Sequence, residues 1–293
     1  MNPTYSEDTD SNLPNPYVIT YPFKSAVIHY SVKSEYGHGK TYEGADVVYI
    51  KGDKLAKVQS ATVPKPGGKT GKVETLRIFT LEYVYIIDLI NKTGIKIDNS
   101  KKYGKPAYNV LSAEEKKAFH NRMNRRGIVS LDLVGLGKKI GDETVLGREC
   151  DVYESGKQLS GKELLDSIES GEGFLYKKSW IWKEAKIPLR TITSRVGWSG
   201  EIVATKIEES PNIPASRFIV PPDIKITYDR EKSEAGKRET LARFYLYKTG
   251  KSKIIRVKTK KEVLSHDKST NPGTPNLPHP DNTGKTNALP AKQ

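Results

Sequence analysis

Hydrophobic and polar residues alternate along several stretches of the chain, which is the pattern of strands with one buried face. After Phe23, the residues Ala26, Ile28, Tyr30 and Val32 fall on one face and polar residues largely fill the other. Further alternating runs follow, separated by Gly, Pro and Asn at spacings typical of hairpins. These runs predict strands over residues 42–50, 55–63, 73–81, 83–89, 95–98, 175–182, 189–196 and 201–208.

Helical patterns are confined to two short segments. Ser112 can cap a helix while Glu115 reaches back to it, and this capping box predicts a helix over residues 112–123. A second helix is predicted over residues 160–170. Because strands precede and follow these helices without βαβ alternation, we expect a mainly β fold with a few helices (α+β): a curved antiparallel sheet, or half-open β-barrel, closed by helices.

The composition changes toward both ends of the chain. Residues 1–16 are acidic and rich in Pro and Asn, and residues 265–293 are rich in Pro, Asn and Thr, so both segments are predicted to be disordered. One domain is therefore expected over residues 17–227. A basic extension over residues 228–264 follows it.

Positive charge gathers in this extension. The 293 residues include 49 Lys and Arg against 35 Asp and Glu, a formal net charge of +14. A basic hairpin is predicted, in which residues 242–247 pair with residues 253–258. Such a surface favours anionic lipid headgroups, nucleic acid or an acidic protein, although an ordinary solvated face explains it as well. The residues predicted to contact an anionic surface are Lys251, Lys253, Arg256, Lys258, Lys260 and Lys261.

Sequence signals for catalysis or metal binding are missing. No G-x-S-x-G turn is present, and Gly68-Lys69-Thr70 lacks the phosphate-loop glycine, since Val63 stands in its place. The histidines lie far apart, and Cys150 is predicted to be a small buried residue on a strand. We therefore expect no metal, no cofactor and no enzymatic activity.

The sequence leaves the cellular location open between two possibilities. No run approaches the roughly 20 apolar residues that would span a bilayer. Residues 1–16 lack the basic start and apolar core of a signal peptide. Either the protein is cytoplasmic, or a leader has been removed from this sequence.

Four segments together resemble the periplasmic LolA/LolB-like proteins, the outer-membrane lipoprotein-sorting fold, and specifically its divergent branches. The segments are 83–88 (YVYIID), 146–153 (LGRECDVY), 180–183 (WIWK) with 187–190 (IPLR), and 213–214 (IP) with 218–222 (FIVPP). The resemblance implies an incomplete antiparallel barrel closed on one side by helices, with an apolar cavity for acyl chains. It also implies export, so we expect a periplasmic or other extracytoplasmic location.

Alternation and the resemblance together suggest which residues line that cavity. Trp180 and Trp182 share one strand face with Tyr176, and Leu189 joins them beyond a bend. Ordinary core packing explains these aromatic residues as well. The residues predicted to bind the ligand are Leu76, Ile78, Tyr83, Tyr85, Ile87, Tyr176, Trp180, Trp182 and Leu189.

The leading functional hypothesis is an exported carrier or chaperone-like protein that shelters acyl chains of lipids or lipoproteins. A noncatalytic envelope module that uses the same fold for protein contacts, with a filled interior, is the second. A cytoplasmic nucleic-acid binder acting through the basic extension is the third, supported by Phe244, Tyr245 and Tyr247 among the cations.

Overall fold

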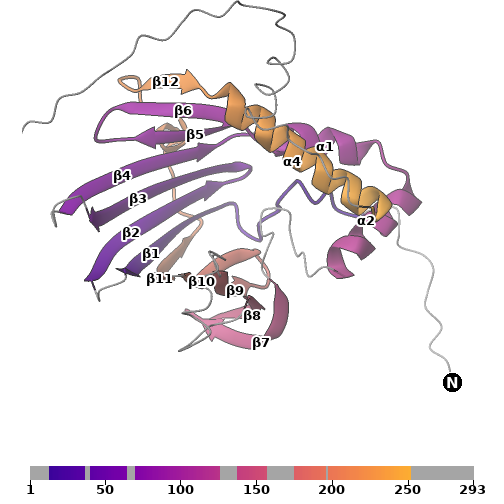
Figure 1. The fold of residues 1–293 in the computed structure, drawn as a ribbon, viewed down its shortest axis with the longest axis horizontal. Helices are drawn as coiled ribbons and strands as arrows, with labels where there is room; N and C mark the ends of the chain where they lie inside the picture. The colour runs from indigo at the N-terminus through magenta and orange to yellow at the C-terminus, as the bar shows by residue number, and fades with distance from the viewer. Residues whose placement is uncertain are drawn as a thin grey trace, which may run out of the picture. The chain divides into compact units, whose positions relative to one another are not determined.

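The computed structural model describes residues 13–36, 40–64, 70–125, 137–156, 175–195 and 197–251. Within these residues, twelve strands form one curved sheet (Figure 1). All of them belong to one compact unit, Met1–Ile254. The expected mainly β fold with a few helices is therefore confirmed. Among the described residues, no helix combines the length and apolar character needed to cross a membrane.

The strands follow one another as hairpins in two series. Their bounds are β1 Ser25–Tyr36, β2 Lys40–Lys51, β3 Lys54–Pro64, β4 Thr70–Phe79, β5 Tyr83–Asp88, β6 Thr93–Asp98, β7 Lys138–Val145, β8 Arg148–Ser155, β9 Leu175–Trp182, β10 Ile187–Arg195, β11 Trp198–Glu209 and β12 Lys225–Tyr228. Their order in the sheet is β12-β6-β5-β4-β3-β2-β1-β11-β10-β9-β8-β7. Antiparallel pairing of β1 with β11 joins the two series, and β12 adds to β6 in parallel.

Local turn chemistry fixes the register of these hairpins. Between β7 and β8, Leu146 and Gly147 both have positive φ, +51° and +73°, and Val145 pairs with Arg148. A two-residue turn with positive φ at both positions matches the right-handed twist of the strands that it joins. The Leu-Gly pair therefore closes a tight hairpin at the edge of the sheet.

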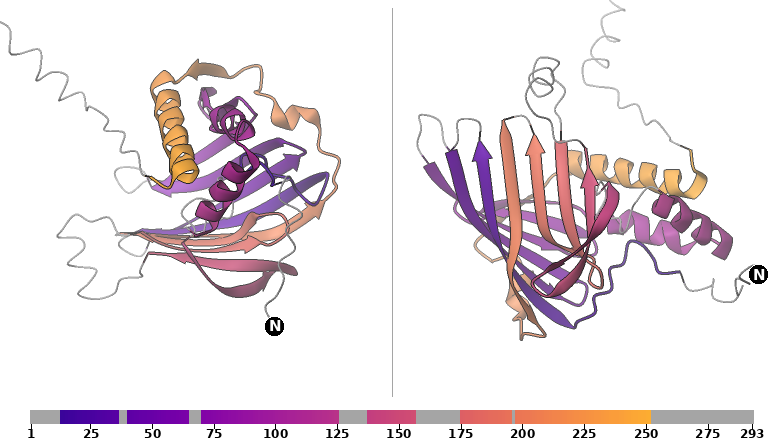
Figure 2. Two further views of the ribbon diagram at one scale, coloured as in Figure 1. Left: turned by 90° about the vertical axis from the view of Figure 1, so that its right-hand side faces the viewer. Right: turned by 90° about the horizontal axis from the view of Figure 1, so that it is seen from below.

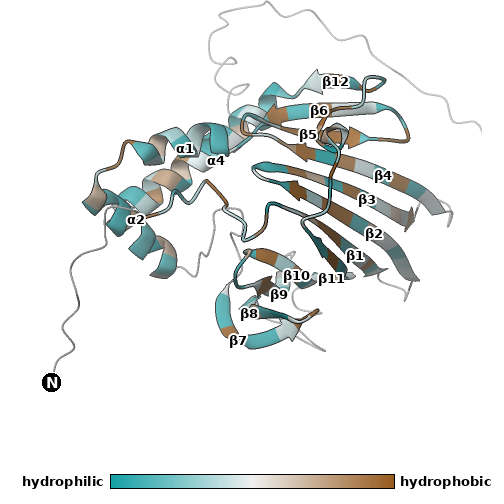
Figure 3. Ribbon diagram, turned by 180° about the vertical axis from the view of Figure 1, so that it is seen from behind, coloured by the Kyte–Doolittle hydropathy of each residue, from teal (hydrophilic) through white to brown (hydrophobic). Residues whose placement is uncertain are grey.

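Hydrophobic and polar bands alternate along the strands (Figure 3), and a buried apolar cluster lies on each face of the sheet. One face contributes Ile28, Tyr30 and Ile50 to the largest buried cluster. The opposite face contributes a second cluster, which includes Ile78. Residues 210–226, with the short 3-10 helix η4 Ala215–Phe218, cover this second face and add Phe218 to its cluster.

Three helices lie on the concave side of the sheet (Figure 2, left): α1 Lys101–Asn109, α2 Ala113–Arg125 and α4 Arg230–Thr249. A third buried cluster joins them. The ring of Phe119 on α2 lies 5.5 Å from that of Tyr108 on α1 and 5.4 Å from that of Tyr247 on α4, edge-on in both cases. Aromatic pairs in this arrangement stabilise a contact beyond their buried area.

The predicted helix over residues 112–123 is confirmed as α2, and its capping box forms as expected. The Ser112 backbone N–H donates to Glu115 Oε2 at 3.0 Å, and the Glu115 N–H donates to Ser112 Oγ at 3.2 Å. The predicted helix over residues 160–170 lies outside the described residues.

The predicted basic hairpin is wrong for its first strand, because residues 242–247 belong to helix α4. Asp229 caps that helix by accepting from the Lys232 N–H, and Gly250 ends it at φ +75°. At helical spacing, Phe244 and Tyr247 both pack on Phe119, an arrangement that a strand would not allow. The predicted second strand, residues 253–258, lies outside the described residues, as does the tail over residues 265–293.

The expectation of disorder over residues 1–16 needs a correction at its end. Residues 1–12 lie outside the described residues. Asn15, however, donates from Nδ2 to the Lys105 carbonyl at 3.3 Å and to Asn109 Oδ1 at 2.7 Å. These contacts attach Asn15 to α1.

Candidate functional site

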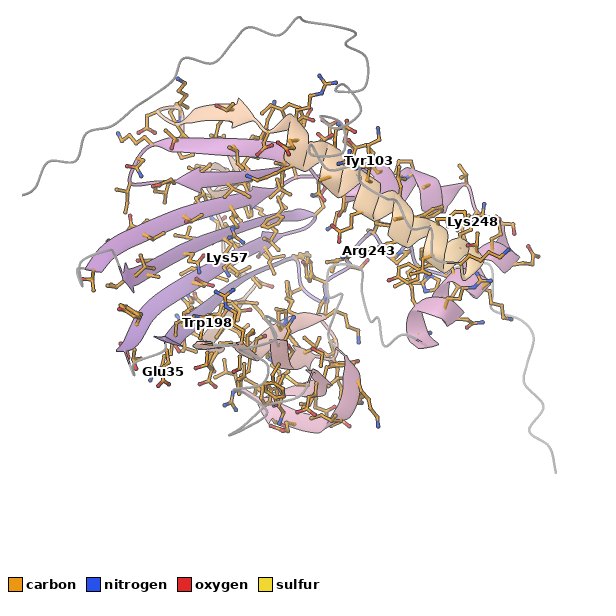
Figure 4. All side chains as sticks on the ribbon, in the orientation of Figure 1. Glu35, Lys57, Tyr103, Trp198, Arg243 and Lys248 are labelled. Atoms are coloured by element: carbon orange, nitrogen blue, oxygen red, sulfur yellow. The ribbon has the colours of Figure 1, made fainter. Side chains whose placement is uncertain are left out.

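A cavity of about 710 Å³ lies between the concave face of the sheet and helices α1 and α4. Lys57 on the sheet and Arg243 on α4 are among its lining residues (Figure 4). Ligand pockets in proteins typically measure about 300–1,000 Å³. The cavity is therefore the candidate site of this molecule.

The floor of the cavity contains a continuous apolar row. Residues directly opposite on neighbouring strands share a face of the sheet. Strand pairing places Ile50 opposite Leu55, Leu55 opposite Phe79, Phe79 opposite Val84 and Val84 opposite Ile97. All five line the cavity. Four strand spacings of about 4.8 Å make this apolar row roughly 19 Å long.

A charged pair interrupts the apolar lining beside this row. The Asp46 carboxylate on β2 is fully buried and forms an ion pair with Lys57 Nζ on β3, whose side chain is 27% exposed. Lys57 Nζ contacts Oδ2 of Asp46, whereas Oδ1 has no hydrogen-bond partner among the described residues. Buried carboxylate oxygens without donors are uncommon in folded proteins.

Tyr17 and Tyr30 are two of the three described tyrosines that line the cavity. The Tyr30 hydroxyl donates to the Pro188 carbonyl at 3.1 Å. Burial, with a further contribution from the nearby Asp46 carboxylate, raises the pKa of Tyr30. The Tyr17 ring lies against Gly104 of α1, and its hydroxyl is buried without a partner in the described structure. Burial likewise raises the pKa of Tyr17, so both rings remain neutral.

Charged residues of both signs surround the cavity. Lys101 and Lys105 come from α1, Lys186 from the turn before β10, and Arg243 from α4. Arg243 pairs with Glu239 one turn earlier on the same helix. The lining thus changes from apolar over the central strands to polar near the helices.

Five of the predicted ligand-binding residues lie together, but away from this cavity. Leu76 pairs with Ile87 and Ile78 with Tyr85, so these four residues share one face of the sheet. That face is the outer one, where these four pack under residues 210–226. Tyr83 borders a smaller pocket of about 300 Å³ near Phe218.

Three of the four remaining predicted residues belong to the adjoining core. Trp180, Trp182 and Leu189 are buried in one cluster with Ile28 and Tyr30. Trp180 Nε1 donates to Glu143 Oε2 at 2.7 Å, and the Arg190 guanidinium lies 4.5 Å from its ring. The Tyr176 hydroxyl donates to Glu154 at 2.8 Å. Of the nine predicted residues, none is among those that line the larger cavity in the described structure, and their contact with a ligand stays a prediction.

Of the basic residues predicted to contact an anionic surface, Lys251 is described and is exposed just beyond α4. Lys253, Arg256, Lys258, Lys260 and Lys261 lie outside the described residues. Cys150 is fully buried, as predicted, and burial raises the pKa of its thiol.

No protein-family model matches the chain, and no curated protein matches it. Several solved structures are similar to it. An uncharacterised conserved protein from Thermus thermophilus has 10% identity and a TM-score of 0.37, over 71% of this chain and 92% of that one. A putative outer membrane lipoprotein-sorting protein domain from Vibrio parahaemolyticus has 12% identity and a TM-score of 0.30, over 66% and 88%. A LolA superfamily protein from Nitrosomonas europaea has 11% identity and a TM-score of 0.28, over 70% and 94%.

Proteins of the family that the sequence resembles are thus among the solved structures similar to this chain. With TM-scores below 0.5, these similarities carry no conclusion about function. The cavity and its lining residues are therefore the features that bear on function.

Proposed function

We propose that this protein binds the acyl chain of a lipid or lipoprotein in its cavity, as a noncatalytic carrier or chaperone-like protein. The apolar row Ile50-Leu55-Phe79-Val84-Ile97 is the observation that supports this proposal. An extended alkyl chain laid across the five strands would contact apolar side chains along its length. Each buried methylene would contribute about 0.8 kcal/mol, so a long chain could bind without any reactive group.

The open cavity also favours this proposal over a module used only for protein contacts. That alternative expects a filled interior. A volume of about 710 Å³ above the sheet is instead large enough for a ligand. We place the protein beyond the cytoplasmic membrane, where acyl chains of lipoproteins need shelter from water, with Lys251 and the basic residues after it facing anionic headgroups.

Native mass spectrometry of protein recovered from the envelope fraction of its own cells tests both the proposed location and the proposed acyl ligand. We expect the wild-type protein in that fraction, carrying a mass that lipid extraction identifies as an acylated molecule. Val84→Trp should abolish this bound mass, because the indole would fill the cavity above β5.

Val73→Trp is the matched control, since Val73 lies on the neighbouring strand β4, is 36% exposed and does not line the cavity. This variant should keep its ligand. A wild-type protein without any bound acylated molecule, and unable to take one up after delipidation, would contradict the proposal.

A further inference from the structure

We infer that the ligand is an amphiphile whose polar group both donates and accepts hydrogen bonds, such as a hydroxyl or a secondary amide, and that this group is seated over Asp46 and Lys57. The inference depends on the proposed function and specifies the chemical class of its ligand. Asp46 and Lys57 are the one charged pair described on the cavity floor.

The Asp46 carboxylate is incompletely satisfied. Its side chain has no exposed surface, Lys57 Nζ pairs with Oδ2, and Oδ1 has no hydrogen-bond partner among the described residues. A carboxylate offers about four acceptor sites, and a buried acceptor left unpaired destabilises the folded protein. A donor that arrives with a ligand would remove this cost.

The strand register places the pair where the floor changes from apolar to polar. Next to the apolar row lies a mixed row of cross-strand partners, Val48, Lys57, Arg77, Ile86 and Ile95. The row beyond it is polar throughout, with Asp46, Gln59, Thr75, Asp88 and Thr93. An amphiphile with its tail on the apolar row would have its polar group near Lys57 and Asp46.

The two charges together select the polar group. Lys57 can donate to a ligand oxygen, and Asp46 can accept only from a ligand N–H or O–H. An ester or ether oxygen alone would leave Asp46 unsatisfied, a lone anion would be repelled by Asp46, and a lone cation by Lys57. A hydroxyl or a secondary amide satisfies both residues.

Two probes with the same saturated chain test this inference on delipidated full-length protein. Monopalmitoylglycerol carries hydroxyl donors and oxygen acceptors, whereas methyl palmitate carries acceptors only. We expect the wild-type protein to bind monopalmitoylglycerol roughly tenfold more tightly in a fluorescence displacement titration, as one hydrogen bond to a charged group would give.

Replacing both charges, Asp46→Leu with Lys57→Met, should reduce this preference to less than about twofold. Removing both partners of a buried pair leaves no uncompensated charge, so the variant should fold, and its thermal unfolding verifies this. The matched control replaces an exposed ion pair, Lys92 with Asp223 at 2.9 Å, by Met and Leu, and should keep the tenfold preference.

The outcomes separate the inference from the proposed function. Equal affinity of the wild-type protein for the two probes, or an unchanged preference in the Asp46→Leu/Lys57→Met variant, overturns the inference and leaves acyl binding intact. Failure of the wild-type protein to bind either probe overturns acyl binding itself.

Discussion

Asp142 on β7 lies between two lysines of the sheet surface. Its Oδ1 is 2.9 Å from Lys139 Nζ and 3.0 Å from Lys183 Nζ. Hydrogen bonds from Lys139, first, and from Lys183 lower the pKa of Asp142 from 3.8 to about 2. The folded protein therefore prefers the charged carboxylate more strongly than the unfolded chain does.

This preference predicts acid sensitivity at one residue. The stabilisation from Asp142 is complete above pH 3.8 and is lost as the pH falls through about 2. Across that interval, the free energy of unfolding of the wild type should fall further than that of Asp142→Asn, as measured by urea unfolding. High salt should shrink the difference, because the pair is exposed. Equal decreases in the free energy of unfolding of the wild type and of Asp142→Asn would contradict this prediction.

Two adjacent residues of β4 lie on opposite faces of the sheet, and the sequence alone does not show which face borders the cavity. Ile78 packs on the outer face, whereas Phe79 lines the cavity. Leu76, Ile78, Tyr85 and Ile87 share the outer face, whereas the sequence prediction placed them in the cavity. Alternation cannot say which face is concave, because both faces are apolar here and a shift of one residue exchanges them.

At the scale of whole elements, helices α1 and α4 each contain one interior glycine, but their surroundings differ. A Cβ built on Gly104 of α1 would lie 2.0 Å from Tyr17 Cε1, whereas one on Gly236 of α4 would meet nothing within 4 Å. Gly104 thus allows the Tyr17 ring to approach the helix backbone beside the cavity.

Alanine should therefore have opposite effects in the two helices. Gly236→Ala should raise the free energy of unfolding by about 0.5–1 kcal/mol, the usual gain of alanine over glycine inside a helix. Gly104→Ala should lower it by about 1–3 kcal/mol, because the methyl group displaces the Tyr17 ring. Urea unfolding of both variants measures this, and stabilisation by Gly104→Ala would show that the ring does not occupy that position.

Elements with strong local signals were predictable, and those fixed by tertiary contacts were not. The capping box at Ser112 identified α2 directly. Helix α1 was missed because Pro106 interrupts its pattern. In α4, the aromatic residues Phe244, Tyr245 and Tyr247 suggested a strand. Their helical conformation depends on packing against α2, which the local sequence does not reveal.

On the scale of the whole molecule, the sheet separates two apolar regions. Its concave face borders the cavity, and its outer face is closed by residues 210–226. Phe218, 8% exposed, anchors that cover, while its neighbour Ile219 is 61% exposed. Stability and ligand binding should therefore depend on different faces.

Phe218→Ala should lower the free energy of unfolding by about 3–5 kcal/mol through loss of its buried ring. Ile219→Ala should change it by no more than about 0.5 kcal/mol. Under conditions where Phe218→Ala remains folded, its affinity for an acyl probe should match that of the wild type. A loss of affinity that follows the loss of stability would indicate that the two apolar regions are coupled.

The order of the strands in the sheet could likewise be predicted only where neighbouring strands are also neighbours in sequence. Hairpin spacing predicted neighbours within β1–β6, where connections are short. Nothing local in the sequence marks the pairing of β1 with β11, or the parallel addition of β12 to β6, because both join distant segments. Such pairings arise only when whole surfaces meet.

The junction of β1 with β11 has a consequence for the order of folding. The hairpins of β1–β6 have short connections, so they can form before β11 reaches β1. Until β11 pairs with it, the edge of β1 offers free amide and carbonyl groups to any extended chain nearby. We therefore expect the risk of aggregation to be greatest in partly folded molecules and to end when β11 docks.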